Sequence, residues 1–479
     1  MQPLDEVVDT STAAAGLPAA TPPASEATRV AERLGSARFR RDYGLKYAYV
    51  TGAMYRGIAS KEMVVAMGRA GLMGFLGTGG LPLDRLRADI AFIQHELSAG
   101  QAYGMNLIAN VGDPQTELRT ARLFIEMGVP AIEASAFMQI TPALVLYRAA
   151  GLVAAGDGVM SRTRILAKLS RPEVARAFMS PAPERIVQKL VADGSLTEEQ
   201  ARLLARVPMA NDICVEADSG GHTDQGVALV MLSAIQRLRQ ELGLAPDTVR
   251  IGLAGGIGTP EAVAAAFIMG ADFVLTGSIN QCTVEAGTSD AAKDLLQDID
   301  IQDTDYAPAG DMFEMGAKVQ VLKKGVFFPA RANRLYALYT QYDSMDQFPA
   351  PVREQLEDKY FKRPLADVWR ETQDFFRGRG REDEIAKAEA NPKHKMALVF
   401  RWYFGHSMRA VFSGDPKQKV DYQIHTGPAL GAFNRWVKGT PWENWRQRHV
   451  DQIAERLMRD AAALMLARLR ALEAPRPLA

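Results

Sequence analysis

One histidine follows a short apolar run and is preceded by two glycines. The octet Glu-Ala-Asp-Ser-Gly-Gly-His-Thr occupies residues 216–223, after a run at 212–216 with the composition of a buried strand. Gly220 and Gly221 allow the backbone to approach a flat or anionic ligand, and the imidazole of His222 is matched to proton transfer near neutral pH. The octet therefore predicts either a catalytic site at His222 or an ordinary strand-to-helix turn with a hydrogen-bonded histidine.

Polar residues and glycines also lie within or directly after the ends of other apolar runs. Asn106 and Lys168 belong to such runs, and the residues that follow runs are Gly52-Ala53-Met54, Gly77-Thr78-Gly79-Gly80, Gly255-Gly256 and Thr276-Gly277-Ser278. These residues can act on one ligand only if the fold brings the ends of the runs together. The elements between the runs decide this.

Eight runs have the character of strands, and helical patterns follow most of them. The strand runs lie at 47–50, 72–76, 103–108, 131–134, 164–169, 212–216, 250–254 and 272–275. The helical patterns lie at 61–70, 83–99, 114–127, 142–152, 172–178, 225–242 and 260–269. This alternation predicts an α/β fold, a closed (β/α)8 TIM barrel, in preference to an open doubly wound sheet. The active site of such a barrel lies at the C-terminal strand ends, where the residues above converge.

The last two strand ends carry the features of a phosphate site. Gly255 and Gly256 precede a helix that starts near Pro260, while Gly277 and Ser278 offer amides and a hydroxyl beside it. Exposed amides and a helix dipole favour an anion, and barrels build phosphate sites from these two loops. A mononucleotide phosphate is the expected occupant, and glycines that serve only tight turns are the alternative.

The chain divides into three predicted regions. Residues 1–36 form a disordered N-terminal tail, because their start is rich in Ala, Pro, Thr and Ser. Residues 37–302 form the barrel, with a helical insertion at 181–209 between strands five and six. Residues 303–479 form a mainly α C-terminal region for substrate and docking.

Composition excludes several classes of function. Lys plus Arg and Asp plus Glu both number 56, so no global field favours nucleic acid or an anionic membrane. Two cysteines, Cys214 and Cys282, argue against a disulfide framework, and no spacing typical of metal ligands occurs. No secretory signal and no apolar run of about 18 residues is present, so we expect a cytoplasmic protein.

The order of the motifs resembles a known superfamily. Gly52-Ala53-Met54, Met105-Asn106-Leu107, Lys168, the octet, Ala254-Gly255-Gly256-Ile257 and Thr276-Gly277-Ser278 resemble the FMN-dependent 2-nitropropane dioxygenase (nitronate monooxygenase) family and FMN enoyl reductases. The octet, the helical insertion and residues 421–434 resemble the trans-acting enoyl reductases (PfaD type) of polyunsaturated fatty acid synthases and trans-acyltransferase polyketide synthases. The similarity covers roughly residues 40–465.

The resemblance implies an FMN site at the strand ends. In this site Gly52, Ala53 and Met54 line the flavin ring, and Gly220 and Gly221 form a wall close to that ring. Asn106 and Lys168 bond the polar edge of the ring, where a cation stabilises the reduced flavin. The residues implied for the phosphate are Gly255, Gly256, Thr276, Gly277 and Ser278. A structural ion pair for Lys168 and a strand-end cap for Asn106 stay open as alternatives.

The resemblance also implies a reaction. NADPH reduces FMN and leaves, an enoyl thioester takes its place, and His222 either supplies a proton or polarises the thioester carbonyl. Glu216 and Asp218 are weaker candidates, for orienting a neighbour and for capping a turn. His425, His406 and Tyr422 are assigned to the core or to the surroundings of the pocket.

The implied partner is an acyl carrier protein, which is usually acidic. Lys318, Lys323, Lys324, Arg331 and Arg334 form either a basic docking face or a solvated helix face. The closing segment, residues 443–472, packs on the barrel or on a second protomer of a homodimer. The competing functions are a nitronate monooxygenase-like FMN oxidoreductase and a non-catalytic assembly partner of a synthase.

Overall fold

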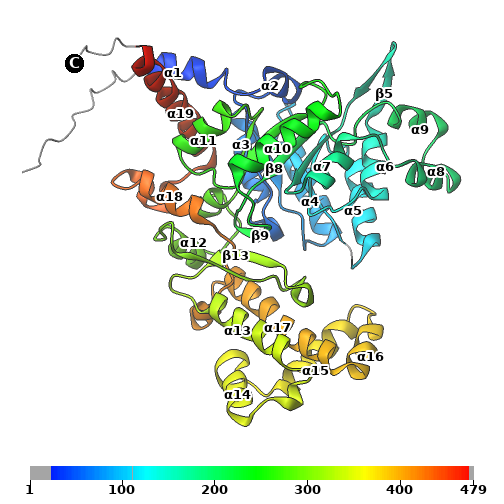
Figure 1. Ribbon diagram of the computed structural model, residues 1–479, viewed down its shortest axis with the longest axis vertical. Coiled ribbons are helices and arrows are strands. Elements are labelled where there is room, and N and C mark those ends of the chain that lie inside the picture. The colour runs from blue at the N-terminus through cyan, green and yellow to red at the C-terminus, as the bar shows by residue number, and fades with distance from the viewer. Residues whose placement is uncertain (1–22, 111, 474–479) are drawn as a thin grey trace, which may run out of the picture.

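A closed barrel of eight parallel strands forms the centre of the molecule. The computed structural model describes residues 23–110 and 112–473. The strand order is β1-β11-β10-β8-β7-β4-β3-β2 (Figure 1). The bounds are β1 (Tyr49–Thr51), β2 (Met73–Leu76), β3 (Gly104–Ile108), β4 (Ala131–Ser135), β7 (Arg164–Leu169), β8 (Asp212–Glu216), β10 (Arg250–Ala254) and β11 (Val274–Thr276). The predicted (β/α)8 barrel is confirmed, because each of the eight expected runs supplies one barrel strand.

Helices connect the barrel strands and cover their outer face. They are α3 (Lys61–Arg69), α4 (Leu83–Glu96), α5 (Pro114–Glu126), α6 (Pro142–Ala150), α7 (Pro172–Met179), α10 (Ala228–Glu241) and α11 (Pro260–Ile268). Ser60, Asp113, Thr141 and Thr259 cap four of them by accepting a hydrogen bond from an amide of the first turn. None of the described helices has the length and apolarity needed to cross a bilayer.

The helical insertion is confirmed between β7 and β8, where α8 (Glu184–Ala192) and α9 (Glu198–Leu204) lie. A hairpin of β5 (Leu152–Ala155) and β6 (Gly158–Ser161) precedes β7, and the sequence patterns did not predict it. The chain turns between these strands at Gly156, which has φ 55°.

Part of the predicted disordered tail is helical. Residues 1–22 lie outside the described residues, but α1 (Ala24–Ala31) is a helix, and α2 (Ala37–Tyr43) follows directly after the predicted tail. The prediction of disorder is wrong for α1, which packs against α19 (Val450–Glu473) and buries Ala27 and Ala31 (Figure 1). The partner that stabilises α1 lies at the opposite end of the sequence, so local composition does not reveal it.

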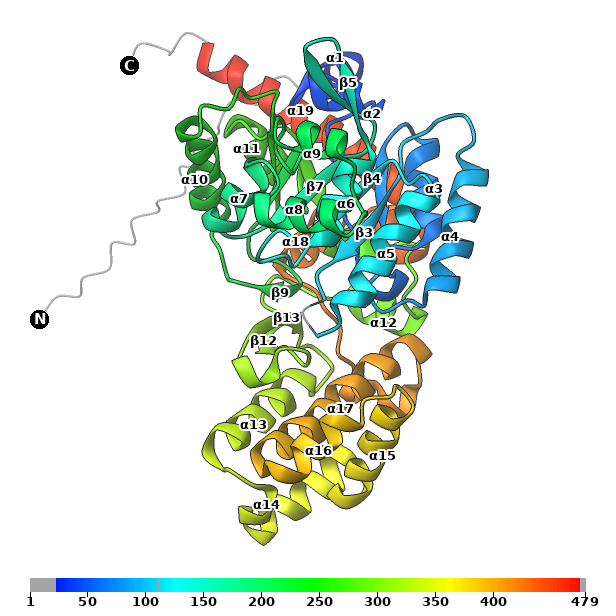
Figure 2. The same ribbon diagram turned by 90° about the vertical axis from the view of Figure 1, so that its right-hand side faces the viewer.

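A small antiparallel sheet lies between the barrel and a helical unit (Figures 1 and 2). Its order is β12-β13-β9, with β12 (Thr304–Pro308), β13 (Lys318–Leu322) and β9 (Gly221–Thr223). Val319 of β13 stands opposite His222 of β9. His222, for which an ordinary strand-to-helix turn is one of the two alternatives, is therefore part of a strand.

The helical unit, residues 328–413, has a hydrophobic core of its own. It comprises α13 (Phe328–Gln341), α14 (Ala350–Gln355), a π-helical turn (Leu356–Phe361), α15 (Leu365–Arg377), α16 (Glu382–Ala390) and α17 (Pro392–Ser413). Its core contains Phe328, Phe400 and Phe404, packed with Phe313 of the β12–β13 hairpin. After it, α18 (Pro428–Trp436) and α19 return to the barrel core. The region 303–479 thus contributes to both cores.

Asp421 joins the helical unit to the segment that returns to the barrel. It is 1% exposed and accepts hydrogen bonds from Arg331, from Tyr403 Oη at 2.7 Å and from Lys362 Nζ at 3.3 Å. A buried carboxylate is tolerated here because cations and a hydroxyl surround it.

We expect Asp421→Ala to lower the free energy of unfolding by roughly 3–5 kcal/mol, because it leaves Arg331 half-buried without its partner. Asp367→Ala is the control, since Asp367 pairs with Arg370 on the surface and should change stability by about 0–1 kcal/mol. Denaturant unfolding measures both, and equal losses in the two variants would contradict the structural role of Asp421.

Candidate active site

A buried lysine stands between two carboxylates at the C-terminal strand ends. Lys168 Nζ, on β7, lies 3.3 Å from Glu133 Oε1 of β4 and 3.4 Å from Glu216 Oε1 of β8. The Lys168 side chain is 14% exposed and that of Glu133 is fully buried. Burial lowers the pKa of Lys168, but the two carboxylates outweigh it and raise that pKa well above its ordinary value. The lysine therefore carries a positive charge at neutral pH.

Glu133 gathers the other predicted residues around it. Its Oε2 accepts from the backbone amide of Ala53 at 3.0 Å, and its Oε1 accepts from Ser135 Oγ at 3.1 Å. Asn106 Nδ2 donates to the Glu133 carbonyl and to Ser135 Oγ, both at 2.9 Å. The structure thus places Ala53, Asn106 and Lys168 in one polar network at the strand ends. Sequence reasoning missed Glu133, although a lone carboxylate in the strand Ala-Ile-Glu-Ala-Ser was a usable signal.

The glycines of the last two barrel loops leave open space. Gly255 and Gly256 have φ of 85° and 76°, which favours glycine. A Cβ at Gly255 would lie 2.7 Å from the carbonyl carbon of Ala217, whereas a Cβ at Gly256 or Gly277 would meet nothing within 4 Å. Gly256 and Gly277 thus have free space beside them and Gly255 does not, and a phosphate between these two loops stays a prediction.

Thr276 is held inside its loop. It is 1% exposed, its Oγ1 lies 2.6 Å from Tyr49 Oη, and Asn280 Nδ2 donates to that Oγ1 at 2.9 Å. Its hydroxyl therefore fixes the shape of the loop. Gly52 is also buried, and a Cβ there would lie 2.5 Å from Leu275 Cδ2. Contact of these residues, or of Met54 and Ser278, with a ligand stays a prediction.

His222 projects from β9 and pairs with an acid that the sequence did not single out. Its Nε2 lies 2.9 Å from Asp311 Oδ1, in the loop between β12 and β13, and its side chain is 49% exposed. Partial burial lowers the pKa of His222, but Asp311 outweighs this and raises it above the ordinary 6.5. His425 lies close by and behaves oppositely, because burial, followed by the charge of His222, lowers its pKa to about 4. Of these two histidines, His222 is therefore the one whose surroundings favour the protonated form.

The two glycines of the octet pack on the chain itself. A Cβ at Gly220 would lie 2.8 Å from Thr426 Cα, and a Cβ at Gly221, where φ is 94°, would lie 3.6 Å from His425 Nδ1. Their closest approach is thus to residues 425–427. The wall against a flavin that we predict for Gly220 and Gly221 stays a prediction.

Asp218 and Glu216 hold the octet in place. Asp218 accepts from Thr223 Oγ1 at 2.6 Å, from Gln320 Nε2 at 3.2 Å and from the hydroxyl of Tyr306. Glu216 accepts from Ser219 Oγ at 3.3 Å besides its contact with Lys168. Asp218 therefore fastens the octet to the small sheet, and Glu216 links it to the buried lysine.

Some of the predicted residues lie away from this network. His406 stacks on Trp402 in the helical unit, with ring centroids 4.8 Å apart. Tyr422 is buried and donates to the Asp415 carbonyl at 3.0 Å. Within the predicted basic docking face, Arg331 is engaged by Asp421 and Lys324 pairs with Asp303 at 3.5 Å. Lys318 and Lys323 are exposed at opposite ends of β13, and Arg334 is exposed on α13.

Comparison with known proteins gives a consistent set of relatives. The family model for nitronate monooxygenase matches residues 42–312, and that for the inserted helical domain of [acyl-carrier-protein] S-malonyltransferase matches residues 342–422. The crystal structure of the enoyl reductase domain of MlnA, from the macrolactin biosynthesis cluster of Bacillus amyloliquefaciens, is 44% identical with a TM-score of 0.88. The match covers 92% of this chain and 99% of that domain.

Two curated proteins extend the set. Polyketide biosynthesis protein PksE of Bacillus subtilis is 56% identical over 449 residues, which are 93% of this chain and 58% of PksE. A polyunsaturated fatty acid synthase component of a Thraustochytrium species is 47% identical over 414 residues, which are 85% of this chain and 28% of that component. The chain thus spans less than two thirds of the length of these curated relatives.

We expect Asp311→Asn to lower the pKa of His222, because the variant keeps the partial burial but removes the charge that stabilises the imidazolium. Titration of the imidazole by NMR should give a pKa above 6.5 in the parent and a lower value in the variant. The stabilisation that the parent pair supplies is present while His222 is protonated and is lost as the pH rises through its folded pKa. Glu314→Gln is the control, since Glu314 contacts His394 instead. An unchanged His222 pKa would show that Asp311 does not set it.

Proposed function

The chain belongs to the nitronate monooxygenase family, and from that premise we propose that it is an FMN-dependent enoyl reductase. It acts in trans on a polyketide or polyunsaturated fatty acid synthase and reduces the α,β double bond of an enoyl thioester on an acyl carrier protein, with NADPH as the transient hydride donor. The observation that carries this proposal is the buried Lys168, kept charged by Glu133 and Glu216 at the strand ends. The likeness to an enoyl reductase domain over nearly the whole chain supports the same reaction class.

The described residues fit FMN. The open space beside Gly256 and Gly277, on the loops that barrels use for phosphate, suits its phosphate, with Gly255, Thr276 and Ser278 completing the two loops. Gly52, Ala53, Met54, Asn106 and Lys168 surround the place of the ring, with Gly220 and Gly221 on the side of β9. When bound, FMN supplies the hydride chemistry between the nicotinamide and the β-carbon of the substrate.

Lys168 prepares the site electrostatically. Its ammonium group favours the negative charge that reduction adds to a flavin, and it can do so only while it stays protonated. Glu133 and Glu216 guarantee the protonated state across the physiological pH range by raising the lysine pKa. Glu133 also accepts a hydrogen bond from the Ala53 amide. It therefore fixes the position of the Lys168 ammonium group relative to the loop after β1.

His222 serves the substrate side. Asp311 raises the pKa of the imidazole and so favours its protonated form, which has a proton either to give to the α-carbon or to share with the thioester carbonyl. Asp311 orients the ring through the 2.9 Å contact with Nε2. The lowered pKa of His425 favours its neutral form, so only the imidazole of His222 is favoured in the charged form.

A nitronate monooxygenase-like activity is the second candidate, because the matching family model carries that description. It leaves the helical unit without a role, whereas carrier-bound substrates need a docking surface. The match of residues 342–422 to the inserted helical domain of a transferase that acts on acyl carrier protein favours the first candidate. A non-catalytic role in synthase assembly leaves the charged network around Lys168 unexplained.

Under anaerobic conditions we expect the FMN-loaded protein to oxidise more than one equivalent of NADPH only when an enoyl thioester such as crotonyl-pantetheine is present, and to yield the saturated thioester. His222→Gln should lower kcat by about 100-fold or more, the usual contribution of a positioned acid. Steady-state absorbance and mass spectrometry of the product measure both quantities.

His95→Gln is the matched control, because His95 is an exposed histidine on α4. A parent protein that turns over nitronates with oxygen but no enoyl thioester would overturn the proposed function. A His222→Gln variant as fast as the parent would remove the catalytic role of His222 and leave the reductase assignment intact.

A further inference from the structure

The last turns of α17 reach the rim of the barrel. The C-terminal end of α17 lies beside α12 (Asp290–Leu296) (Figure 2), and a Cβ at Gly414 would lie 3.2 Å from Ser289. Next to this junction, the loop after β1 presents Arg56, whose guanidinium lies over the ring of Phe412 at 5.5 Å. Arg56 has φ 52°, and its amide donates to the Gly79 carbonyl at 2.9 Å. A strained rim residue is thus fixed against the helical unit.

A second arginine stands on the same face of α17. Arg409 precedes Phe412 by three residues, so the two side chains are neighbours on the helix surface. Arg409 is exposed. Burial of its inner atoms, followed by the charge of Arg56, lowers its pKa. Arg56 and Arg409 therefore both lie next to Phe412, Arg56 from the loop after β1 and Arg409 from the preceding turn of α17, although 353 positions separate them in the chain.

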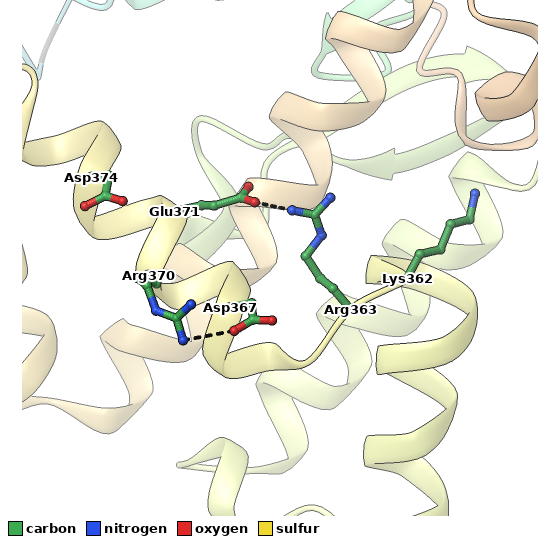
Figure 3. A pocket seen from close by; sticks show the side chains of 6 residues that line it. All are labelled: Lys362, Arg363, Asp367, Arg370, Glu371 and Asp374. Atoms are coloured by element: carbon green, nitrogen blue, oxygen red, sulfur yellow. Dashed lines mark hydrogen bonds and ion pairs between the residues drawn. The ribbon is translucent and has the colours of Figure 1, made fainter.

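Nearby cations have carboxylate partners. Lys362 pairs with Asp421 at 3.3 Å, and Arg363 pairs with Glu371, as Figure 3 shows together with the pair of Arg370 and Asp367. Among the described residues, no carboxylate oxygen lies within 4.0 Å of the guanidinium groups of Arg56 and Arg409. The junction therefore carries two arginines without a salt-bridge partner among the described residues, in contrast to the paired charges of Figure 3.

Two arginines beside one aromatic ring, neither with a described carboxylate within 4.0 Å, favour an anion next to them. Guanidinium groups present several donors in a plane and bind phosphate oxygens with charge-assisted hydrogen bonds. We propose that Arg56 and Arg409 bind a phosphate group of an incoming substrate at the rim of the barrel. The proposal rests on the proposed function, whose two reactants both carry phosphates, the pantetheine arm and the nicotinamide nucleotide.

The position of Arg56 links this phosphate site to the reacting centre. Arg56 follows Ala53 by three residues, and the Ala53 amide is bound to Glu133 beside Lys168. A phosphate held at Arg56 and Arg409 thus anchors the far end of a substrate whose reactive end enters at the strand ends. Anchoring of this kind orients the reacting atoms without touching them.

Calorimetric titration of the full-length, FMN-loaded protein tests the proposal without turnover. The two probes are pantetheine 4′-phosphate and 2′,5′-ADP, each compared with its dephosphorylated form. We expect Arg56→Gln and Arg409→Gln each to weaken binding of one phosphorylated probe by about tenfold, the loss typical of one charge-assisted hydrogen bond. Binding of the dephosphorylated form should stay unchanged.

The control is Arg370→Gln, which removes a surface arginine of the same helical unit that already has a carboxylate partner. Loss confined to pantetheine 4′-phosphate supports the carrier arm as the source, and loss confined to 2′,5′-ADP supports the nucleotide. The proposal is overturned if Arg56→Gln and Arg409→Gln weaken binding of the two probes no more than Arg370→Gln does. It is also overturned if the parent protein binds neither probe. If the protein reduces no enoyl thioester but binds a phosphorylated probe through Arg56 and Arg409, the phosphate site stands. Only the proposed function is then overturned.

Discussion

Lys168 can be buried at the mouth of the barrel only because two carboxylates are buried with it. An isolated ammonium group in this position loses its hydration and its proton, whereas a paired one keeps both its charge and its place. Glu133 contributes most to this arrangement, since it also binds the Ala53 amide and Ser135. One carboxylate thereby couples strands β1, β4 and β7, and through Ser135 it positions Asn106 on β3. The loops that surround the flavin in our proposal depend on this single buried charge.

The substrate side depends on a different constraint. His222 belongs to β9, whose only described neighbour in the small sheet is β13, and its partner Asp311 comes from the β12–β13 loop. The histidine therefore takes its position from the segment that leads into the helical unit. Asp218 fastens the same octet through Tyr306 and Gln320. The barrel supplies the residues assigned to the cofactor, and the small sheet fixes the residue assigned to the substrate.

The barrel could be predicted from the sequence because each strand is a short apolar run and helical patterns separate most of these runs, a local signal. The three strands of the small sheet could not, since β9 is Gly-His-Thr and pairs with a strand almost one hundred residues away. The sequence does not single out Asp311 and Glu133 either, for a related reason. A single carboxylate has no periodicity, and its meaning comes from the lysine or histidine that folding brings to it. Lys168 and Asn106, in contrast, stood at recognisable strand ends, where the barrel geometry predicts that they meet.

The central claim is that the charge of Lys168, maintained by Glu133, serves a bound flavin. The most direct test is the midpoint potential of the FMN retained by the purified parent and by Lys168→Met, measured with a reference dye under anaerobic conditions. We predict that the parent holds one FMN per chain and that the variant has a potential more negative by on the order of tens of millivolts, because a nearby cation is lost. A parent that binds no FMN, or a variant with an unchanged potential, would contradict the account.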